Sequence, residues 1–335
     1  MKIAVLAPIA WRTPPRHYGP WEQMASNLTE GLVSAGLDVT LFATGESVTA
    51  GTLASVIPVG YEEDKQVDAK VAECLHISNL MEQADQFDLI HSHYDFLPLS
   101  YSRLIKTPVL TTIHGFSSEK ILAVYQKYNR TAHYVSISNS DRHSSLDYLA
   151  TVYNGIETKN FSFRELPDDY LLFFGRIHPD KGTAEAILIA IKAKRKLIIA
   201  GIVQNSEYFR EQVEPFLNED IRFVGSAGPE QRDELLGGAA ALLHPIAFSE
   251  PFGLSVAEAM LCGTPVIAYN KGSMPELIKD KITGFLVSNI EQAVTAVGSI
   301  SQIDRKACRT HALENFSQKK MVEDYIALYH QILNK

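Results

Sequence analysis

Cysteine is scarce in this sequence, because 335 residues include only Cys74, Cys262 and Cys308. Their odd number and wide spacing argue against a disulfide framework and against a zinc ribbon. Long apolar runs are also missing, since no segment reaches the roughly 18 residues of a membrane-spanning helix. The first residues lack the apolar core of a signal peptide as well. These absences lead us to expect a cytoplasmic protein with no stable insertion in a membrane.

An excess of positive charge is missing too. The chain has 31 Lys and Arg against 39 Asp and Glu, a formal net charge of −8, so no overall basic field attracts a nucleic acid or an anionic membrane. The expected helix at 66–84 mixes both signs and has no basic face, which argues against binding to a membrane surface. Hydrophobic residues make up 46% and charged residues 21%, as in ordinary globular proteins, and the length favours two domains.

The first half of the chain alternates apolar runs with helical patterns. Apolar residues recur every three or four positions from Trp21 to Ala35, and Gly36 follows, which indicates a helix and its end. We expect buried strands at Ile3–Ala7, Leu37–Ala43, Phe87–Ile90, Pro108–Ile113 and Tyr134–Ile137. Strands that alternate with helices in this way form a parallel sheet with right-handed crossovers.

The pattern starts again after a linker-like stretch at Asn154–Asp169. We expect a second doubly wound sheet with strands at Tyr170–Phe174, Leu197–Ala200, Ile221–Val224, Ala240–Leu243 and Pro265–Ala268, and a final amphipathic helix at Lys319–Leu333. The predicted divisions are an N-terminal domain at 1–160, a C-terminal domain at 161–315 and a terminal helix at 316–335. Ligands of such sheets bind beyond the carboxyl ends of the strands, so we expect a deep cleft between two Rossmann-like α/β domains.

Two glutamates flank an expected helix start within His244–Met260. Gly253 lets a ligand approach the backbone there, so amides at 252–256 are candidates for holding a phosphate. Glu250 precedes this helix and Glu258 lies about two turns inside it, and carboxylates accept hydrogen bonds from sugar hydroxyls. A solvated glutamate and a capped, buried one are the ordinary alternative, which the strand, loop and helix context disfavours.

A second motif, Phe174–Gly182, follows the first strand of the second domain. Arg176 and Lys181 supply two cations, one planar and one a flexible point charge, which suits a diphosphate. Lys181 precedes Gly182, so the residue order of a P-loop is absent, and the G-x-G-x-x-G fingerprint is absent as well. NAD chemistry is therefore disfavoured. A surface pair on a solvated loop is the alternative interpretation.

The first domain offers weaker signals. Gly19 opens directly onto the Trp21 helix, where its amide suits an anion, and His114 ends an expected strand, where side chains enter a binding site. A lone histidine is otherwise often structural. His91 and His93 share one face of a strand end, but zinc needs further ligands at a suitable spacing, and neither HExxH nor a cysteine pair supplies them. We predict no metal site.

Taken in order, the motifs resemble glycosyltransferase family 4, whose members have the GT-B fold, use nucleotide diphosphate sugars and retain the anomeric configuration. The similarity covers nearly the whole chain. It is carried by Tyr18–Glu22, Ile113–Gly115, Tyr153–Ile156, Gly175–Arg176 with Lys181–Gly182, Glu250–Glu258, Gly263–Val266, Thr283–Phe285, and Phe316–Ser317 with the helix behind it. The resemblance implies a C-terminal helix that crosses back onto the first domain.

The resemblance also implies a role for each motif. The catalytic candidates are Arg176 and Lys181 on the donor diphosphate, Glu250 on the hydroxyls of the donor sugar, and His114 near the reacting centre. The donor-binding candidates are Gly19, Ala227, Phe252, Gly253, Leu254, Ser255, Val256 and, on the ribose, Glu258. No metal and no cofactor beside the nucleotide sugar is implied, because preorganised cations can stabilise the developing charge.

Two positions depart from the family pattern. Gly19-Pro20 replaces a glycine pair, which removes one amide donor and stiffens the loop, and Tyr153 stands where relatives often have proline. The first departure weakens the case for a phosphate contact in this loop and leaves the second domain unaffected. The family's mechanism implies a displacement on one face of the sugar, in which the leaving phosphate helps to deprotonate the acceptor.

The donor and the acceptor are less sharply indicated. Gly228 and Pro229, beside the expected base loop, favour uracil as the base of the donor. Glu230 is close enough to leave guanine as an alternative, because guanine has donors that a carboxylate can accept. We therefore expect UDP-glucose or a similar hexose donor, with UDP favoured over GDP. Aromatic and imidazole groups on the acceptor side suit a small ring-bearing or saccharide acceptor with a free hydroxyl; they belong to Trp11, His17, Tyr18, His93 and Tyr94. A nucleotide-sugar epimerase and a non-catalytic sugar-binding protein remain alternatives.

Overall fold

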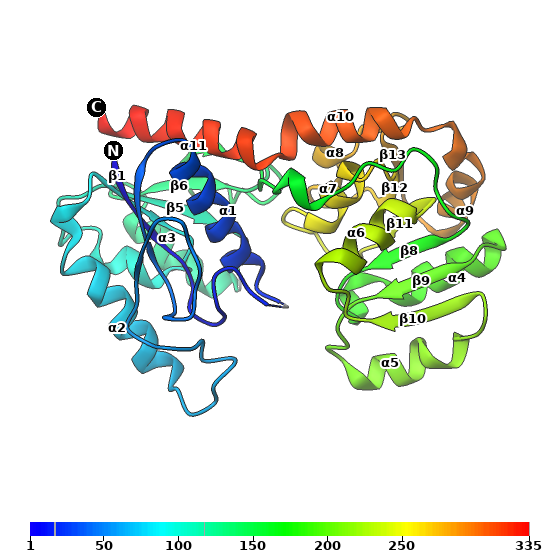
Figure 1. The fold of residues 1–335 in the computed structure, drawn as a ribbon, viewed down its shortest axis with the longest axis horizontal. Helices are drawn as coiled ribbons and strands as arrows, with labels where there is room; N and C mark the ends of the chain where they lie inside the picture. The colour runs from blue at the N-terminus through cyan, green and yellow to red at the C-terminus, as the bar shows by residue number, and fades with distance from the viewer. Residues whose placement is uncertain (17, 117, 335) are drawn as a thin grey trace. The chain divides into compact units, whose positions relative to one another are not determined.

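A computed structural model describes residues 1–16, 18–116 and 118–334 (Figure 1). The chain forms two compact units. Unit 1 comprises Met1–Gly155 and Gln318–Lys335, and unit 2 comprises Ile156–Ser317. These divisions lie a few residues from the predicted ones at 160 and 315. The return of the C-terminal helix to the first unit, which the family resemblance implied, is confirmed.

Unit 1 is built on a seven-stranded parallel sheet in the order β3-β2-β1-β4-β5-β6-β7. Its strands are β1 (Lys2–Leu6), β2 (Asp38–Phe42), β3 (Thr52–Ala54), β4 (Leu89–Ser92), β5 (Val109–Ile113), β6 (His133–Ser136) and β7 (Tyr148–Thr151). Its helices are α1 (Pro20–Ser34), α2 (Ala69–Met81), α3 (Leu122–Tyr128) and α11 (Gln318–Leu333). All five predicted strands are present, and the two that were not predicted, β3 and β7, form the edges of the sheet.

Unit 2 is built on a six-stranded parallel sheet in the order β10-β9-β8-β11-β12-β13. Its strands are β8 (Leu171–Phe174), β9 (Leu197–Ala200), β10 (Ile221–Gly225), β11 (Ala241–His244), β12 (Val266–Tyr269) and β13 (Gly284–Val287). Its helices are α4 (Thr183–Ala193), α5 (Ser206–Gln212), α6 (Pro229–Gly238), α7 (Leu254–Leu261), α8 (Met274–Leu277), α9 (Ile290–Ser299) and α10 (Arg305–Phe316). The two doubly wound sheets confirm the predicted fold class.

The sheet of unit 1 has an apolar core on each face. Ile3 and Val5 of β1 belong to the core that α1 and α11 cover, whereas Ala4 and Leu6 belong to the core beneath α2. This division follows from the period of two along a strand, which sends successive side chains to opposite faces. A strand buried on both faces is therefore apolar at every position, which is the pattern that made β1 recognisable in the sequence.

Helix α11 lies against α1, as Figure 1 shows. A glycine, Gly31, stands at the contact: a Cβ atom added there would overlap the Cγ2 atom of Val322. One turn away along α1, the side-chain amide Nε2 of Gln318 donates to the carbonyl oxygen of Asn27 at 2.7 Å. The absence of a side chain at Gly31 thus sets how closely the C-terminal helix approaches α1.

We expect Gly31→Ala to destabilise unit 1 by about 1–3 kcal/mol through overpacking, although the same change in an exposed helix would stabilise it. Val322→Ala should restore part of this loss in the double variant, because it removes the overlapping methyl group. Urea unfolding followed by tryptophan fluorescence measures unit 1 specifically, since both tryptophans, Trp11 and Trp21, lie in it. Additive effects of the two changes would contradict this interpretation.

Candidate functional site

Most of the predicted catalytic side chains follow carboxyl ends of parallel strands. In unit 2, Arg176 comes two residues after β8, and the loop with Glu250 follows β11, the neighbour of β8 in the sheet. In unit 1, His93 and His114 come directly after the adjacent strands β4 and β5. The carboxyl ends of neighbouring parallel strands lie side by side at the same end of the sheet. The candidate residues of each unit therefore lie at the carboxyl-terminal end of its sheet.

A lysine and a glutamate form an ion pair in unit 2. Lys181 ends a short 3₁₀ helix, η5 (Pro179–Lys181), and its Nζ atom pairs with Oε2 of Glu250, with both side chains only 15% exposed. The same ammonium lies over the ring of Phe248, 4.8 Å from its centroid. Arg176 donates to Oε1 of Gln204. Lys181 and Glu250 thus meet at this end of the sheet, and Arg176 lies in a loop at the same end.

The loop that carries Glu250 is held by its own backbone. The carbonyl oxygen of Glu250 accepts from the N–H of Ser273 at 3.0 Å, and the Ser273 hydroxyl donates to the carbonyl oxygen of Phe252 at 2.6 Å. A Cβ atom at Gly272, which has φ +55°, would come within 2.5 Å of the Glu250 nitrogen. The position of Glu250 is therefore fixed by backbone contacts and does not depend on its ion pair alone.

Helix α7 begins where the sequence indicated. Gly253 precedes it with φ 93°, a left-handed conformation that glycine adopts without strain, and Leu254 and Ser255 form its first positions. The first turn of a helix has amides without intrahelical acceptors and a positive dipole end. The N–H of Val256, however, donates to the carbonyl oxygen of Gly253 at 3.1 Å. The Val256 amide, a predicted phosphate ligand, is thus already engaged in a local hydrogen bond.

Glu258 is buried at 5% exposure in the middle of α7 and pairs through Oε1 with Nη2 of Arg232 on α6. Arg232 was not among the predicted site residues, because no motif links it to a glutamate 26 positions later in the chain. Arg232 follows the loop after β10 that contains the predicted base-contact residue Ala227, which is half-buried. The pair therefore joins the start of α6 to the predicted ribose-binding carboxylate.

Three histidines and a tryptophan come together in unit 1. Nδ1 of His93 lies 2.9 Å from Nε2 of His114, and the rings of His91 and His93 stack with centroids 4.5 Å apart. The Trp21 ring stacks on His114 at 5.8 Å. Burial lowers the pKa of His91 and His114 to about 3 and that of His93 well below its ordinary value. These imidazoles are therefore neutral at pH 7 and able both to donate and to accept.

The C-terminal helix is bonded to this histidine cluster. The Tyr329 hydroxyl lies 2.6 Å from Nδ1 of His91, and Oγ1 of Thr112 lies 2.7 Å from both Nε2 of His91 and the Tyr325 hydroxyl. Tyr325 and Tyr329 are fully buried, so these contacts replace hydrogen bonds to water. Helix α11 thereby fixes the ring of His91, on which His93 stacks.

Gly19 and Glu22 form the entry to α1. Gly19 has φ 148° and Pro20 occupies the first helical turn, where its missing N–H costs nothing. The carboxyl of Glu22 is 3% exposed and accepts from the N–H of Trp11 at 3.3 Å. Burial raises its pKa to about 7, an effect that hydrogen bonds from backbone N–H groups reduce. A Cβ at Gly19 would lie 2.9 Å from Oε2 of Glu22. The backbone at Gly19 therefore packs directly against the buried carboxyl.

The predicted acceptor-side residues do not share one environment. Tyr18 is 37% exposed and Trp11 is half-buried, whereas His93 and Tyr94 are buried at 1% and 5% exposure. His17 lies outside the described residues. Tyr18 and Trp11 are therefore accessible to solvent, whereas His93 contacts the buried His114.

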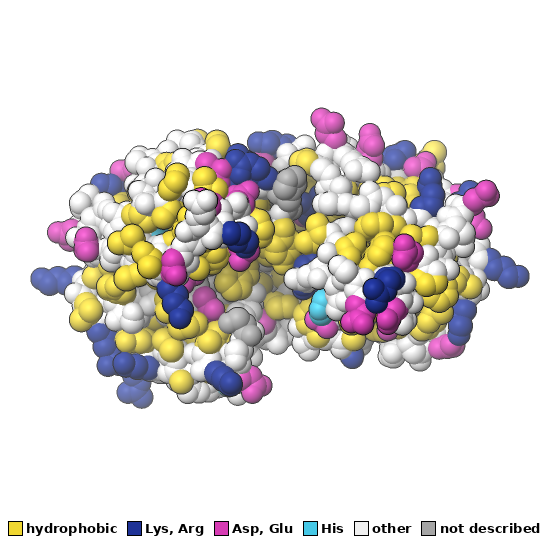
Figure 2. All heavy atoms as spheres, turned by 90° about the horizontal axis from the view of Figure 1, so that it is seen from below, with side chains coloured by type: hydrophobic (Ala, Val, Ile, Leu, Met, Phe, Trp, Pro, Cys, Tyr) yellow, Lys and Arg dark blue, Asp and Glu magenta, His cyan; other side chains and the backbone are white. Residues whose placement is uncertain are grey.

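Within residues 1–16, 18–116 and 118–334, no group of three or more His, Cys, Asp and Glu side chains is arranged to hold a metal ion. No helix in this part of the chain combines the length and apolarity that crossing a bilayer requires. Figure 2 shows acidic and basic side chains interspersed on the face of each unit that it draws.

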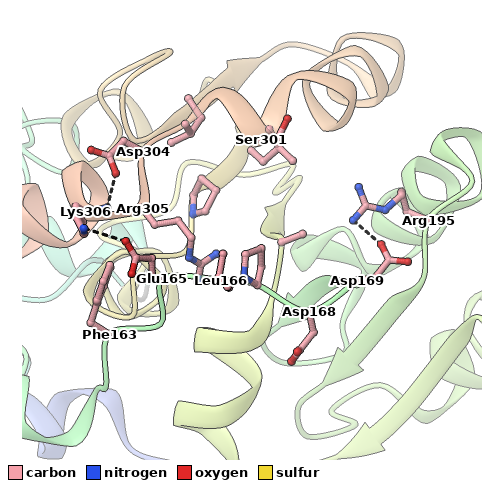
Figure 3. Close-up of a pocket in the computed structure, with 15 residues that line it drawn as sticks. Phe163, Glu165, Leu166, Asp168, Asp169, Arg195, Ser301, Asp304, Arg305 and Lys306 are labelled. Atoms are coloured by element: carbon pink, nitrogen blue, oxygen red, sulfur yellow. Dashed lines mark hydrogen bonds and ion pairs between the residues drawn. The ribbon is translucent and has the colours of Figure 1, made fainter.

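A cavity of about 590 Å³ lies in unit 2, near the amino-terminal ends of β11 and β12 (Figure 3). Its charged groups are paired: Arg195 with Asp169 at 3.0 Å, and Lys306 with Glu165 at 2.9 Å. Arg305 donates to three carbonyl oxygens and to one hydroxyl. No predicted site residue lines this cavity, and it lies at the opposite end of the strands from the candidate site.

Two family models match the chain in succession. One, described as glycosyltransferase family 4, matches residues 22–160, and the other, described as glycosyl transferases group 1, matches residues 156–316. A D-inositol 3-phosphate glycosyltransferase of Catenulispora acidiphila is 26% identical over 87% of this chain and 82% of its own length.

Solved structures share the fold over the whole chain. A glycosyltransferase involved in avilamycin A biosynthesis has a TM-score of 0.78 at 22% identity, covering 100% of this chain and 98% of that one. Anabaena HepE in complex with UDP-glucose has a TM-score of 0.74 at 18% identity, covering 99% of this chain and 100% of that one.

The raised pKa of Glu22 predicts a pH-dependent stability. Its pKa is about 7 in the folded protein against an ordinary value of 4.5, so the folded state binds the proton more tightly than the unfolded state. The free energy of unfolding should therefore fall, by about 2–3 kcal/mol, as the pH rises from about 4.5 to 7. Glu22→Gln removes this titration. The variant should gain this amount relative to wild type between pH 5 and 8.

Urea unfolding of unit 1, followed by tryptophan fluorescence at pH 5 and pH 8, measures this difference. Glu82→Gln is the matched control, because Glu82 is an exposed residue at the end of α2 in the same unit. A stability difference between Glu22→Gln and wild type that stays constant with pH would show that Glu22 titrates alike in both states.

Proposed function

The chain belongs to glycosyltransferase family 4 and has the GT-B fold, and from this premise we propose that it is a retaining hexosyltransferase. The proposed reaction moves a hexose, with glucose favoured, from a nucleotide diphosphate sugar to a hydroxyl of a small molecule or saccharide. UDP is favoured over GDP as the nucleotide. One observation carries the proposal: two cations after β8 and the start of α7 after β11 follow adjacent strands of one sheet.

Arg176 and Lys181 would neutralise the diphosphate of the donor. The diphosphate gains negative charge as the bond to the sugar breaks, and preorganised positive groups stabilise that change most strongly. The amides of Gly253, Leu254 and Ser255 at the positive end of α7 would add to this. These groups supply the charge stabilisation that a metal ion provides elsewhere, so we propose a metal-independent reaction with no cofactor beyond the nucleotide sugar.

Two carboxylates would orient the donor. Glu250 is held in place by Lys181 and by its backbone contacts, and its remaining acceptor capacity suits the hydroxyls of the sugar. Glu258, two turns into α7, would accept from the ribose hydroxyls. Backbone atoms of Ala227 would lie beside the base.

His114 would contact the transferred sugar close to the reacting carbon. As a neutral imidazole it offers a hydrogen bond without adding a positive charge. No second carboxylate is needed as a nucleophile if the acceptor attacks on the face that the diphosphate leaves. In that step the acceptor oxygen bonds to the anomeric carbon, the bond to the phosphate oxygen breaks, and the departing phosphate takes the acceptor proton.

Gly19 would complete the phosphate contacts through its backbone. Only one glycine is present before Pro20, so this contact has a single flexible residue. Trp11 and Tyr18, which are accessible, would contact the acceptor together with His93, Tyr94 and His17. The solved relative with UDP-glucose supports a UDP-sugar donor, and the inositol-phosphate relative is consistent with a small polyhydroxylated acceptor.

Arg176→Ala tests the donor site. The partner of Arg176 is the neutral side chain of Gln204, so its removal leaves no buried charge without a counter-ion. We expect the affinity for the preferred nucleotide sugar to fall by about tenfold or more, as for the loss of a charge-assisted hydrogen bond. Calorimetry with a panel of UDP- and GDP-sugars, together with release of nucleoside diphosphate, measures both binding and turnover.

Lys192→Ala is the matched control, because Lys192 is an exposed cation of the same unit that pairs with Glu291. It should bind the donor as wild type does. If no nucleotide sugar of the panel binds the wild-type protein, the proposal fails. If a donor binds but is epimerised without transfer to any alcohol, the chain is an epimerase.

A further inference from the structure

In the ion pair between Arg232 and Glu258, each side chain has one polar atom that is paired and one that has no hydrogen-bond partner among the described residues. One oxygen of the carboxylate, Oε1, faces Nη2 of Arg232. The other oxygen, Oε2, is buried and has no hydrogen-bond partner among the described residues, and neither has Nε of Arg232. An unpaired oxygen of a buried carboxylate is costly, because it has lost water and gained no donor. Glu258 thus keeps one buried acceptor oxygen without a donor among the described residues.

Arg232 has little freedom to turn away from Glu258. Its guanidinium lies 5.5 Å from the ring centroid of Phe174 and 5.8 Å from that of Phe161. Arginine stacks well on aromatic rings, and such contacts restrict its rotamers. Phe174 is the last residue of β8, and Phe161 comes from the segment that enters unit 2. Two separate parts of the unit therefore hold the side chain in place.

Asp233, the residue after Arg232, makes further contacts that hold α6 against the end of α7. Asp233 accepts from the N–H of Ser162 at 2.7 Å and from the thiol of Cys262 at 3.5 Å. Cys262, the C-cap residue of α7, is four residues after Glu258, about one helical turn away. Two consecutive residues of α6, Arg232 and Asp233, thus contact Glu258 within α7 and Cys262 at its C-cap. The contact between Arg232 and Glu258 belongs to a fixed helix pair.

We propose that Arg232 is a positioning residue that holds Oε1 of Glu258 and thereby presents Oε2 to the ribose hydroxyls of the donor nucleotide. This inference rests on the proposed function of Glu258. Oε2 has acceptor capacity for both hydroxyls of a ribose, while Oε1 stays with the guanidinium. Arginine suits this role better than lysine, because its planar group keeps one orientation toward a carboxylate.

The test compares two nucleotides that differ in one hydroxyl group. Calorimetry with UDP and with 2′-deoxy-UDP gives the preference for the ribose hydroxyl, and GDP with 2′-deoxy-GDP serves if the protein prefers guanine. Wild type should bind UDP about tenfold more tightly than 2′-deoxy-UDP, as expected for a hydrogen bond to a charged group. Glu258→Gln should lose much of this preference.

Arg232→Gln should reduce the preference to about twofold, on the scale of one lost charge-assisted hydrogen bond, and leave the affinity for 2′-deoxy-UDP nearly unchanged. Arg232→Lys, which keeps the charge and loses the planar group, should give an intermediate preference and guards against misfolding of the glutamine variant. Thermal unfolding by circular dichroism checks the fold of each variant. Arg210→Gln, an exposed arginine of α5 that pairs with Glu211, is the matched control.

Three outcomes would overturn the inference. An unchanged preference in both Arg232 variants would mean that Glu258 is held without Arg232. Tighter binding of both nucleotides by Arg232→Gln would mean that the arginine competes with the nucleotide. Equal binding of UDP and 2′-deoxy-UDP by wild type would remove Glu258 from the ribose site. If wild type binds neither UDP nor GDP, the proposed function fails as well, which separates that failure from the first three.

Discussion

A carboxylate that leaves water requires a cation or several hydrogen-bond donors beside it, because an uncompensated buried charge is strongly destabilising. Unit 2 meets this requirement twice, with Lys181 beside Glu250 and Arg232 beside Glu258. Unit 1 meets it only in part at Glu22, where burial raises the pKa to about 7. The two paired glutamates stand where the proposed donor would bind, so the same cations that make their burial possible would also orient them toward that donor.

The parallel sheets were predictable because their central strands are buried on both faces. Such strands are continuous apolar runs, as at β1 and β8, and helices with clear periodicity separate them. The strands that escaped prediction lie at sheet edges. β3 has three residues, none of them buried, and β7 is half-buried throughout; β13 begins with Gly284 and contains only four residues. An edge strand has one neighbour and less burial, so its composition carries a weaker signal.

The places of the candidate residues in the fold were predictable where the order of residues along the chain determines them. Arg176 follows a strand and Gly253 precedes a helix, and both relations are local. Arg232 is different, because its partner Glu258 lies on another helix and the contact exists only after α6 and α7 pack together. The hydrogen bond between Tyr329 and His91 joins residues 238 positions apart, and no local sequence pattern predicts it. Pairings of this kind depend on tertiary structure. Glu258 and His91 could therefore be noticed in the sequence, whereas their pairing with Arg232 and Tyr329 could not be predicted from it.

Neither end of the chain belongs to unit 2, since unit 1 takes both Met1–Gly155 and the final helix α11. Shortening the chain from its C-terminus would therefore damage unit 1 first, by exposing the apolar surface of α1 and by removing Tyr329, a hydroxyl partner of His91. Recombination between relatives is constrained in the same way. A hybrid with a foreign unit 2 would have to replace the internal segment Ile156–Ser317 at two junctions. A single crossover near Gly155 would instead pair a foreign α11 with the native α1. The foreign side chain at the position of Val322 would then have to fit against Gly31.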